Sequence, residues 1–144
     1  MLDNLINSQK YKNLTSNQVK ELLNHLVNEK IEFNLTANIN GVDFNPKIPD
    51  TISDSFSQFT LFTLVNYTFE SIIIEDDMIS FEAGFGNENF GSVCSIPFYA
   101  VFQISIDNSI LFINPIATIE KYFNENKDEQ DQKERSMNAF KLNK

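Results

Sequence analysis

Few residues in this chain combine a reactive type with a spacing that could do chemistry. Carboxylates stand side by side at Glu75, Asp76 and Asp77, and adjacent carboxylates can bind a cation. Calcium loops, however, place oxygen ligands at alternate positions around a Gly and end on a Glu, and this pattern is missing. We therefore interpret the three acids as a solvated turn.

The chain has one histidine, His25, and one cysteine, Cys94. A single histidine cannot form a multi-histidine metal site, and a single cysteine allows neither an intrachain disulfide nor a thiolate cage. His25 is expected to be a partly exposed helix residue and Cys94 a buried, inert thiol. Phosphate-binding loops and common hydrolase motifs are also missing. Two carboxylates far apart in the sequence can be brought together by folding for acid-base catalysis, but nothing in the sequence indicates such a pair. We expect a binding module without cofactor or metal rather than an enzyme.

The stretch 79–101 is the most informative segment. Its first half alternates as a half-buried strand does, with one side formed by Ile79, Phe81, Ala83 and Phe85. Small residues at Ala83, Gly84 and Gly86 leave a bare section, where another strand or a ligand can approach the backbone. Residues 86–91 are expected to form a longer hairpin loop before a second strand over 92–96. Pro97 ends that strand and favours one helical turn after it.

A helix over about 17–29 is predicted by a cap at Thr15-Ser16 and a following apolar stripe that begins at Val19. Residues 1–14 show no clear period and are interpreted as a loosely ordered lead-in. Strands are predicted over 33–39, 59–69, 71–75 and 109–113. A tight turn is expected at Asn40-Gly41, an extended piece from Val42 as far as Pro46, and a loop over 47–55.

Composition indicates a mostly β, α+β domain. The chain has 144 residues, enough for one domain with a core, and its fourteen Phe favour strands. The folded domain is expected over 15–123. Residues 124–136 contain no apolar residue and more acids than bases, which predicts a flexible acidic linker. Residues 137–144 combine Met, Phe and Leu with lysines and are interpreted as a docking peptide, with a frayed end as the alternative.

The formal net charge of −9 repels nucleic-acid phosphates and anionic lipids. We therefore expect neither nucleic acid nor a membrane as partner. A secretory signal would show a basic start followed by a long apolar run, and the first residues do not show this pattern. The cytoplasm is therefore the expected compartment.

The order of these parts resembles the stringent starvation protein B (SspB) family of protease adaptors. The similarity covers roughly 19–115 and is carried by Ile-Ser-Phe-Glu-Ala-Gly-Phe-Gly at 79–86, Ser-Ile-Pro-Phe-Tyr-Ala-Val at 95–101, Asn-Gly-Val at 40–42 and Phe-Ile-Asn-Pro at 112–115. The resemblance implies a small β-barrel-like fold related to Sm proteins, one helix packed on it, and homodimers.

The same resemblance implies a function. Family members bind ssrA-tagged polypeptides and deliver them to the ClpX unfoldase of the ClpXP protease. The resemblance places Ala83 and Phe85 in the wall of a peptide groove, with Phe81, Leu64 and Phe62 as neighbours. Docking on the N-terminal domain of ClpX would use residues of the C-terminal segment, namely Ala139, Phe140, Lys141, Leu142 and Lys144.

Two other functions stay open. The chain could be a peptide-binding domain without a role in degradation. An Sm-like nucleic-acid binder is the second alternative and rests only on the shared barrel shape.

Overall fold

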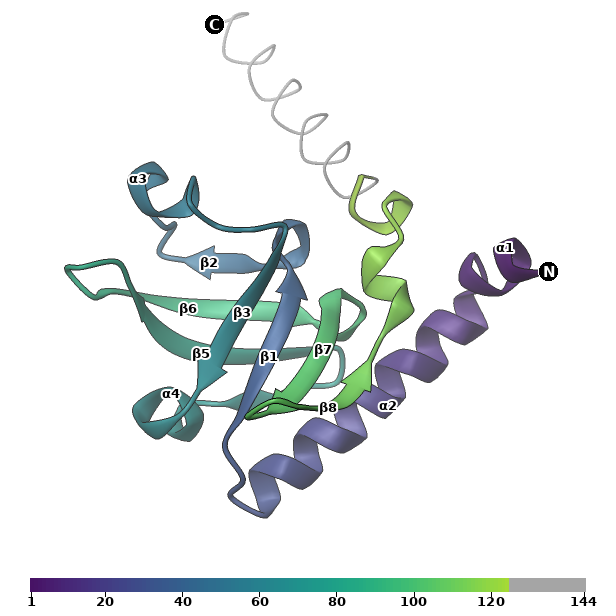
Figure 1. Ribbon diagram of the computed structural model, residues 1–144, viewed down its shortest axis with the longest axis horizontal. Helices are drawn as coiled ribbons and strands as arrows, with labels where there is room; N and C mark the ends of the chain where they lie inside the picture. Colours follow the sequence, from purple (N-terminus) through teal and green to yellow (C-terminus); the bar gives the residue numbers. More distant parts are fainter. Residues whose placement is uncertain (125–144) are drawn as a thin grey trace, which may run out of the picture.

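The computed structural model describes residues 1–124 as an α+β fold rich in β-structure (Figure 1). In this part of the chain the strands form two four-stranded antiparallel sheets and no closed barrel. The first sheet has the order β3 (Phe59–Leu64), β1 (Phe33–Asn38), β7 (Val101–Ile106) and β8 (Ser109–Ile113). The second has the order β2 (Asp43–Asn45), β6 (Phe90–Pro97), β5 (Met78–Phe85) and β4 (Ile73–Ile74). In Figure 1 the strands of one sheet run across those of the other.

The helical elements are α1 (Leu2–Ile6), α2 (Gln9–Asn28), α3 (Asp50–Ser53) and α4 (Asn66–Glu70). Short 3-10 turns occur at η1 (Ile39–Gly41), η2 (Phe98–Ala100) and η3 (Pro115–Thr118). The helical turn expected after Pro97 is thus confirmed at η2.

The long helix begins earlier than its apolar stripe predicted. The Ser8 side chain accepts a hydrogen bond from the backbone N–H of Tyr11 and caps α2 at Gln9. The interpretation of residues 1–14 as a loosely ordered lead-in is therefore corrected, because they contain α1 and the first turns of α2. The apolar stripe failed to reveal this start, since α2 buries no residue before Thr15.

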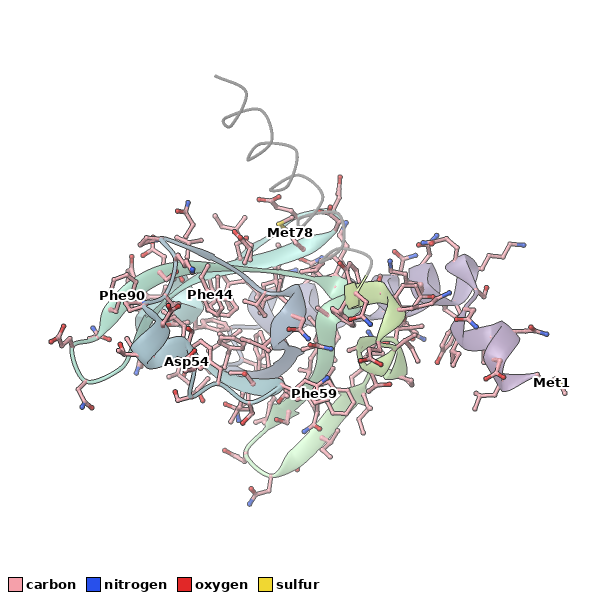
Figure 2. All side chains as sticks on the ribbon, turned by 90° about the horizontal axis from the view of Figure 1, so that it is seen from above. Met1, Phe44, Asp54, Phe59, Met78 and Phe90 are labelled. Atoms are coloured by element: carbon pink, nitrogen blue, oxygen red, sulfur yellow. The ribbon has the colours of Figure 1, made fainter. Side chains whose placement is uncertain are left out.

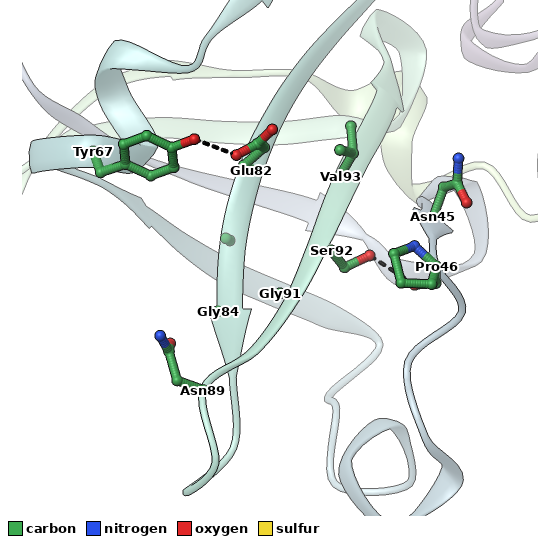
Figure 3. Close-up of a pocket in the computed structure, with 10 residues that line it drawn as sticks. Asn45, Pro46, Tyr67, Glu82, Gly84, Asn89, Gly91, Ser92 and Val93 are labelled. Carbon is green, nitrogen blue, oxygen red and sulfur yellow. Dashed lines mark hydrogen bonds between the residues drawn. The ribbon is translucent and has the colours of Figure 1, made fainter.

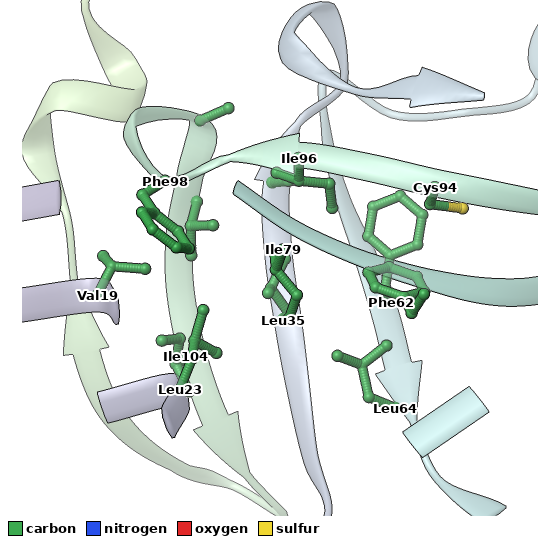
Figure 4. Packing of buried hydrophobic residues seen from close by; sticks show 14 of the residues in the cluster. Val19, Leu23, Leu35, Phe62, Leu64, Ile79, Cys94, Ile96, Phe98 and Ile104 are labelled. Atoms are coloured by element: carbon green, nitrogen blue, oxygen red, sulfur yellow. The ribbon is translucent and has the colours of Figure 1, made fainter. Parts of the chain in front are cut away.

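The core lies between the two sheets and is closed at one side by α2 (Figure 4). Val19 and Leu23 of α2 are fully buried, as are Leu35 of the first sheet and Ile79 and Ile96 of the second. Burying such side chains contributes roughly 1.5–3 kcal/mol each, which makes this cluster the main source of stability.

The β5–β6 hairpin is longer and more regular than expected. Its register runs from Met78 opposite Pro97 to Phe85 opposite Phe90, so the loop contains only residues 86–89. Gly86 has a φ of 73° and supports the turn, because glycine enters this region without steric cost. The predicted hairpin is confirmed, and its loop is shorter than predicted.

A group of phenylalanines supports the tip of this hairpin from its inner face. The ring of Phe85 lies 5.7 Å from Phe44 and 5.8 Å from Phe56, and Phe62 lies 6.4 Å from Phe85. Figure 2 shows Phe44 and Phe90 at the end of the molecule opposite Met1. The hairpin therefore projects on a packed base, which we call the aromatic base (Phe44, Phe56, Phe62 and Phe85).

The strand predicted over 59–69 is wrong beyond Leu64. Asn66 has a φ of 52°, which interrupts an extended chain, and α4 starts there. The Glu32 carboxylate accepts the backbone N–H of Asn66 and so satisfies one of the unpaired donors at the start of α4. The loop predicted over 47–55 likewise contains the short helix α3, whereas the predicted last strand agrees with β8.

Candidate functional site

A trough of about 360 Å³ lies on the outer face of the second sheet (Figure 3). Its lining comes from β5, β6, the β2 end, the hairpin loop and α4. The lining residues are Asn45, Pro46, Tyr67, Glu82, Ala83, Gly84, Asn89, Gly91, Ser92 and Val93. Segments far apart in the sequence therefore meet at one surface.

Two glycines form the floor of this trough. Gly84 of β5 and Gly91 of β6 are direct cross-strand partners. A Cβ atom added to Gly91 would meet no atom within 4 Å, so the space above this position is open. Gly91 therefore exposes the strand backbone, where a ligand can approach closely, whereas the Asn89 side chain occupies the space above Gly84.

The trough runs across the strands rather than along them. On one side stand Glu82 and Val93, which are cross-strand partners in the row next to the glycines. On the other side is Asn89 of the hairpin loop, as Figure 3 shows. Strands lie about 4.8 Å apart, so a path from β2 across β6 to β5 is about 10 Å long and fits roughly three extended residues.

Tyr67 and Pro46 stand at opposite ends of the trough in Figure 3. Pro46 is held against β6, because the Ser92 hydroxyl donates a hydrogen bond of 2.8 Å to its carbonyl oxygen. At the other end the Ser71 hydroxyl accepts the backbone N–H of Glu82 at 2.8 Å and thereby ties the C-terminus of α4 to β5. Both ends are thus anchored to the sheet.

Tyr67 is hydrogen-bonded to the one charged residue of the lining. Its hydroxyl donates to Oε2 of Glu82. The pKa of Tyr67 is raised from its ordinary value of 10, first because of this hydrogen bond and then because of repulsion between a phenolate and the carboxylate. The pair therefore keeps the proton on the Tyr67 hydroxyl.

The structure separates the five groove residues predicted from the sequence. Ala83 contributes to the lining of the trough and is also packed against the core. Phe85 belongs to the aromatic base on the inner face. Phe81, Leu64 and Phe62 are core residues with exposed fractions of 1%, 0% and 4%, which corrects their placement as groove neighbours. Phe81 points inward because a strand alternates its faces, and the outer face of β5 carries Glu82 and Gly84 instead. Phe62 and Leu64 are the buried positions of the alternating strand β3.

The C-terminal segment predicted to dock on ClpX lies outside the described residues, together with its named positions Ala139, Phe140, Lys141, Leu142 and Lys144. The same is true of the predicted linker beyond Asn124.

The residues singled out for possible chemistry lie apart from the trough. Asp76 forms an ion pair of 3.2 Å with Lys20. Cys94 is buried, and desolvation raises the pKa of its thiol to about 12. Within residues 1–124 no three His, Cys, Asp or Glu side chains gather as a metal site would require.

Sequence reasoning missed most of the lining, including Tyr67, Pro46 and Asn89. One usable signal was present, because Gly84 and Gly91 are equally distant from the centre of the loop 86–89. A four-residue loop there predicts that the two glycines pair, whereas the longer loop assumed from the sequence hid this relationship.

No family model matches the chain, and no curated protein is significantly similar to it. Across the described part of the chain, no helix is both long enough and apolar enough to cross a membrane.

Proposed function

We propose that this chain is a peptide-binding adaptor of the SspB type, which binds ssrA-type degradation tags and delivers tagged polypeptides to the ClpX unfoldase of ClpXP. The proposal includes the finer fold assignment, an SspB-like sheet arrangement related to Sm barrels with α2 packed on it. Its support is the resemblance in the sequence together with one long helix followed by two packed antiparallel sheets.

The trough with its glycine floor is the observation that carries the proposal. An extended peptide needs a shallow site where its backbone can approach protein backbone, and Gly91 leaves that space beside its partner Gly84. Apolar contact is available from Val93 and Pro46, and hydrogen-bonding groups from Asn45 and the Tyr67–Glu82 pair. The lining thus offers a peptide both apolar surface and several polar groups.

The role proposed for the site is binding and not catalysis. Its one perturbed group is Tyr67, and the strongly shifted thiol of Cys94 is buried away from the trough. The hydrogen bond from Tyr67 to Glu82 keeps the phenol protonated, and we assign the pair to ligand binding.

Delivery would depend on two weak contacts joined by a linker. The trough holds the tag, residues 137–144 hold the N-terminal domain of ClpX, and residues 124–136 connect them. Such linkage raises the local concentration of substrate and can strengthen binding roughly a hundredfold or more. The adaptor would work in the cytoplasm, and a homodimer would offer two tags and two docking segments to one unfoldase.

The test uses a fluorescent peptide that copies the host's own ssrA tag. Anisotropy should show saturable binding to the full chain, and removal of 137–144 should leave this binding intact while abolishing faster degradation of a tagged substrate by ClpXP. No binding at high micromolar protein would refute tag recognition.

Binding without delivery would instead favour the second candidate, a peptide-binding domain with no role in degradation. A gel shift with RNA at physiological salt tests the nucleic-acid alternative, and the proposal predicts no shift.

A further inference from the structure

Glu82 is the only charged side chain among the residues that line the trough, and none of them is a lysine, arginine or histidine. The neighbouring polar groups Asn45, Asn89 and Ser92 are neutral. Lys47, a described cation, directly follows the lining residue Pro46 in the chain but does not itself line the trough. The trough therefore offers a ligand one negative charge that no lining residue neutralises.

The position of that charge is well defined. The backbone N–H of Glu82 is bound by the Ser71 hydroxyl, and its side chain is bound by the Tyr67 hydroxyl. Its cross-strand partner is Val93, so the carboxylate stands in the wall directly beside the glycine floor.

Glu82 keeps the capacity to bind a ligand while Tyr67 is attached. A carboxylate has two oxygens with about four acceptor positions, and the Tyr67 hydroxyl uses one of them at Oε2. A charged donor placed in the trough would form a charge-assisted hydrogen bond, which is stronger than a neutral one. A carboxylate in the same place would be repelled.

We propose that Glu82 determines specificity and that the trough prefers peptides carrying a cationic group, a lysine or arginine side chain or a free α-amine, at the residue that passes Glu82. This inference rests on the proposed peptide-binding function. The same wall disfavours aspartate or glutamate at that residue, so acidic residues of a bound tag lie outside this position.

The expected preference is modest because the trough is open to solvent. Ion pairs at such surfaces contribute up to about 1 kcal/mol, which predicts about threefold to fivefold tighter binding for lysine than for glutamine. Replacing lysine by glutamate at the same position should weaken binding about tenfold, and raised salt should reduce both effects.

The experiment scans the host tag peptide, replacing each position in turn by Lys, Gln or Glu, and measures anisotropy with the full chain. The protein variants are Glu82→Gln and, as a matched control, Asp43→Asn. Asp43 is exposed on the same face of β2 as Asn45 and carries the same charge, but it does not line the trough. Both variants change the net charge equally.

One peptide position should bind in the order Lys, Gln, Glu with the wild type and with Asp43→Asn, and should lose this order with Glu82→Gln. An order that persists in Glu82→Gln, or that is lost equally in Asp43→Asn, would overturn the inference. Binding of every peptide with equal affinity would overturn it while leaving the proposed function standing. Failure of all peptides to bind the wild type would refute the proposed function itself, and with it this inference.

Discussion

The carboxamide of Asn89 occupies the space that a Cβ atom on Gly84 would need. Such an atom would lie 1.7 Å from Oδ1 of Asn89, far inside van der Waals contact. Glycine at position 84 therefore lets the loop side chain rest on the strand. Its partner Gly91 has no such neighbour, so the two glycines of the floor have different roles.

This difference predicts opposite effects on stability. Gly84→Val should lower the free energy of unfolding by about 1 kcal/mol, because Asn89 must move away from the strand. Gly91→Val should leave stability unchanged or raise it, because a β-branched residue favours a strand and meets open space. Thermal unfolding of both variants measures the contrast. Equal losses in the two variants would contradict this view of the floor.

Leu64 distinguishes a core residue from a groove residue. It is fully buried on β3, so Leu64→Ala should destabilise the protein by about 2–5 kcal/mol through lost burial and the cavity left behind. Urea denaturation measures this loss. The exposed neighbour Leu61 serves as control, since Leu61→Ala should change stability much less. A Leu64→Ala protein as stable as the wild type would show that the residue is not core.

The Tyr67–Glu82 pair predicts a pH effect at the alkaline side. Because the folded pKa of Tyr67 is raised, the contribution of the pair to stability is complete below the unfolded pKa of about 10 and is lost as pH rises through the folded value. Ultraviolet titration of the phenols should show one group that ionises late. In Glu82→Gln this group should return toward its ordinary pKa, and an unchanged titration curve would argue against the pair.

Cys94 should be unreactive in the folded protein. With its pKa raised to about 12, the thiolate fraction at pH 8 is about one in ten thousand, and the side chain is buried. A thiol reagent should therefore modify the protein rapidly in urea and very slowly without it. The raised pKa also means that stability is lost as pH rises above about 9 toward 12. Rapid modification of the native protein would contradict the burial of Cys94.

Alternation and periodicity predicted the strand at 33–39, the two strands of the hairpin and most of α2, because these segments bury one face. The strand at 109–113 was predicted from its apolar run, and its residues are mostly exposed. The same alternation failed after Leu64. Val65, Tyr67 and Phe69 continue the pattern of a strand, yet Asn66 turns the chain and α4 presents Tyr67 to the solvent, where it is 65% exposed. A local sequence pattern cannot reveal a turn that depends on tertiary contacts. Here the contact is the hydrogen bond that the backbone N–H of Asn66 donates to the Glu32 carboxylate.

The candidate site was predicted only at its centre. The bare strand at Ala83 and Gly84 was visible in the sequence, because glycine and alanine reveal missing side chains directly. The ends were not visible, since Tyr67 reaches the trough only because α4 contacts β5, and Pro46 only because β2 pairs with β6. Phe81 was misplaced because an apolar side chain on a strand can face a ligand or the core, and the pattern does not say which.

Tag binding by the wild type and by Gly91→Val, each measured where the protein is fully folded, tests most directly whether the trough binds the peptide. Gly91→Val fills the floor of the trough without disturbing a neighbour, so the fluorescent host tag peptide should bind the wild type saturably and the variant at least about tenfold more weakly. Equal affinity for the two proteins would show that the peptide does not use the trough, and the central claim would then be wrong.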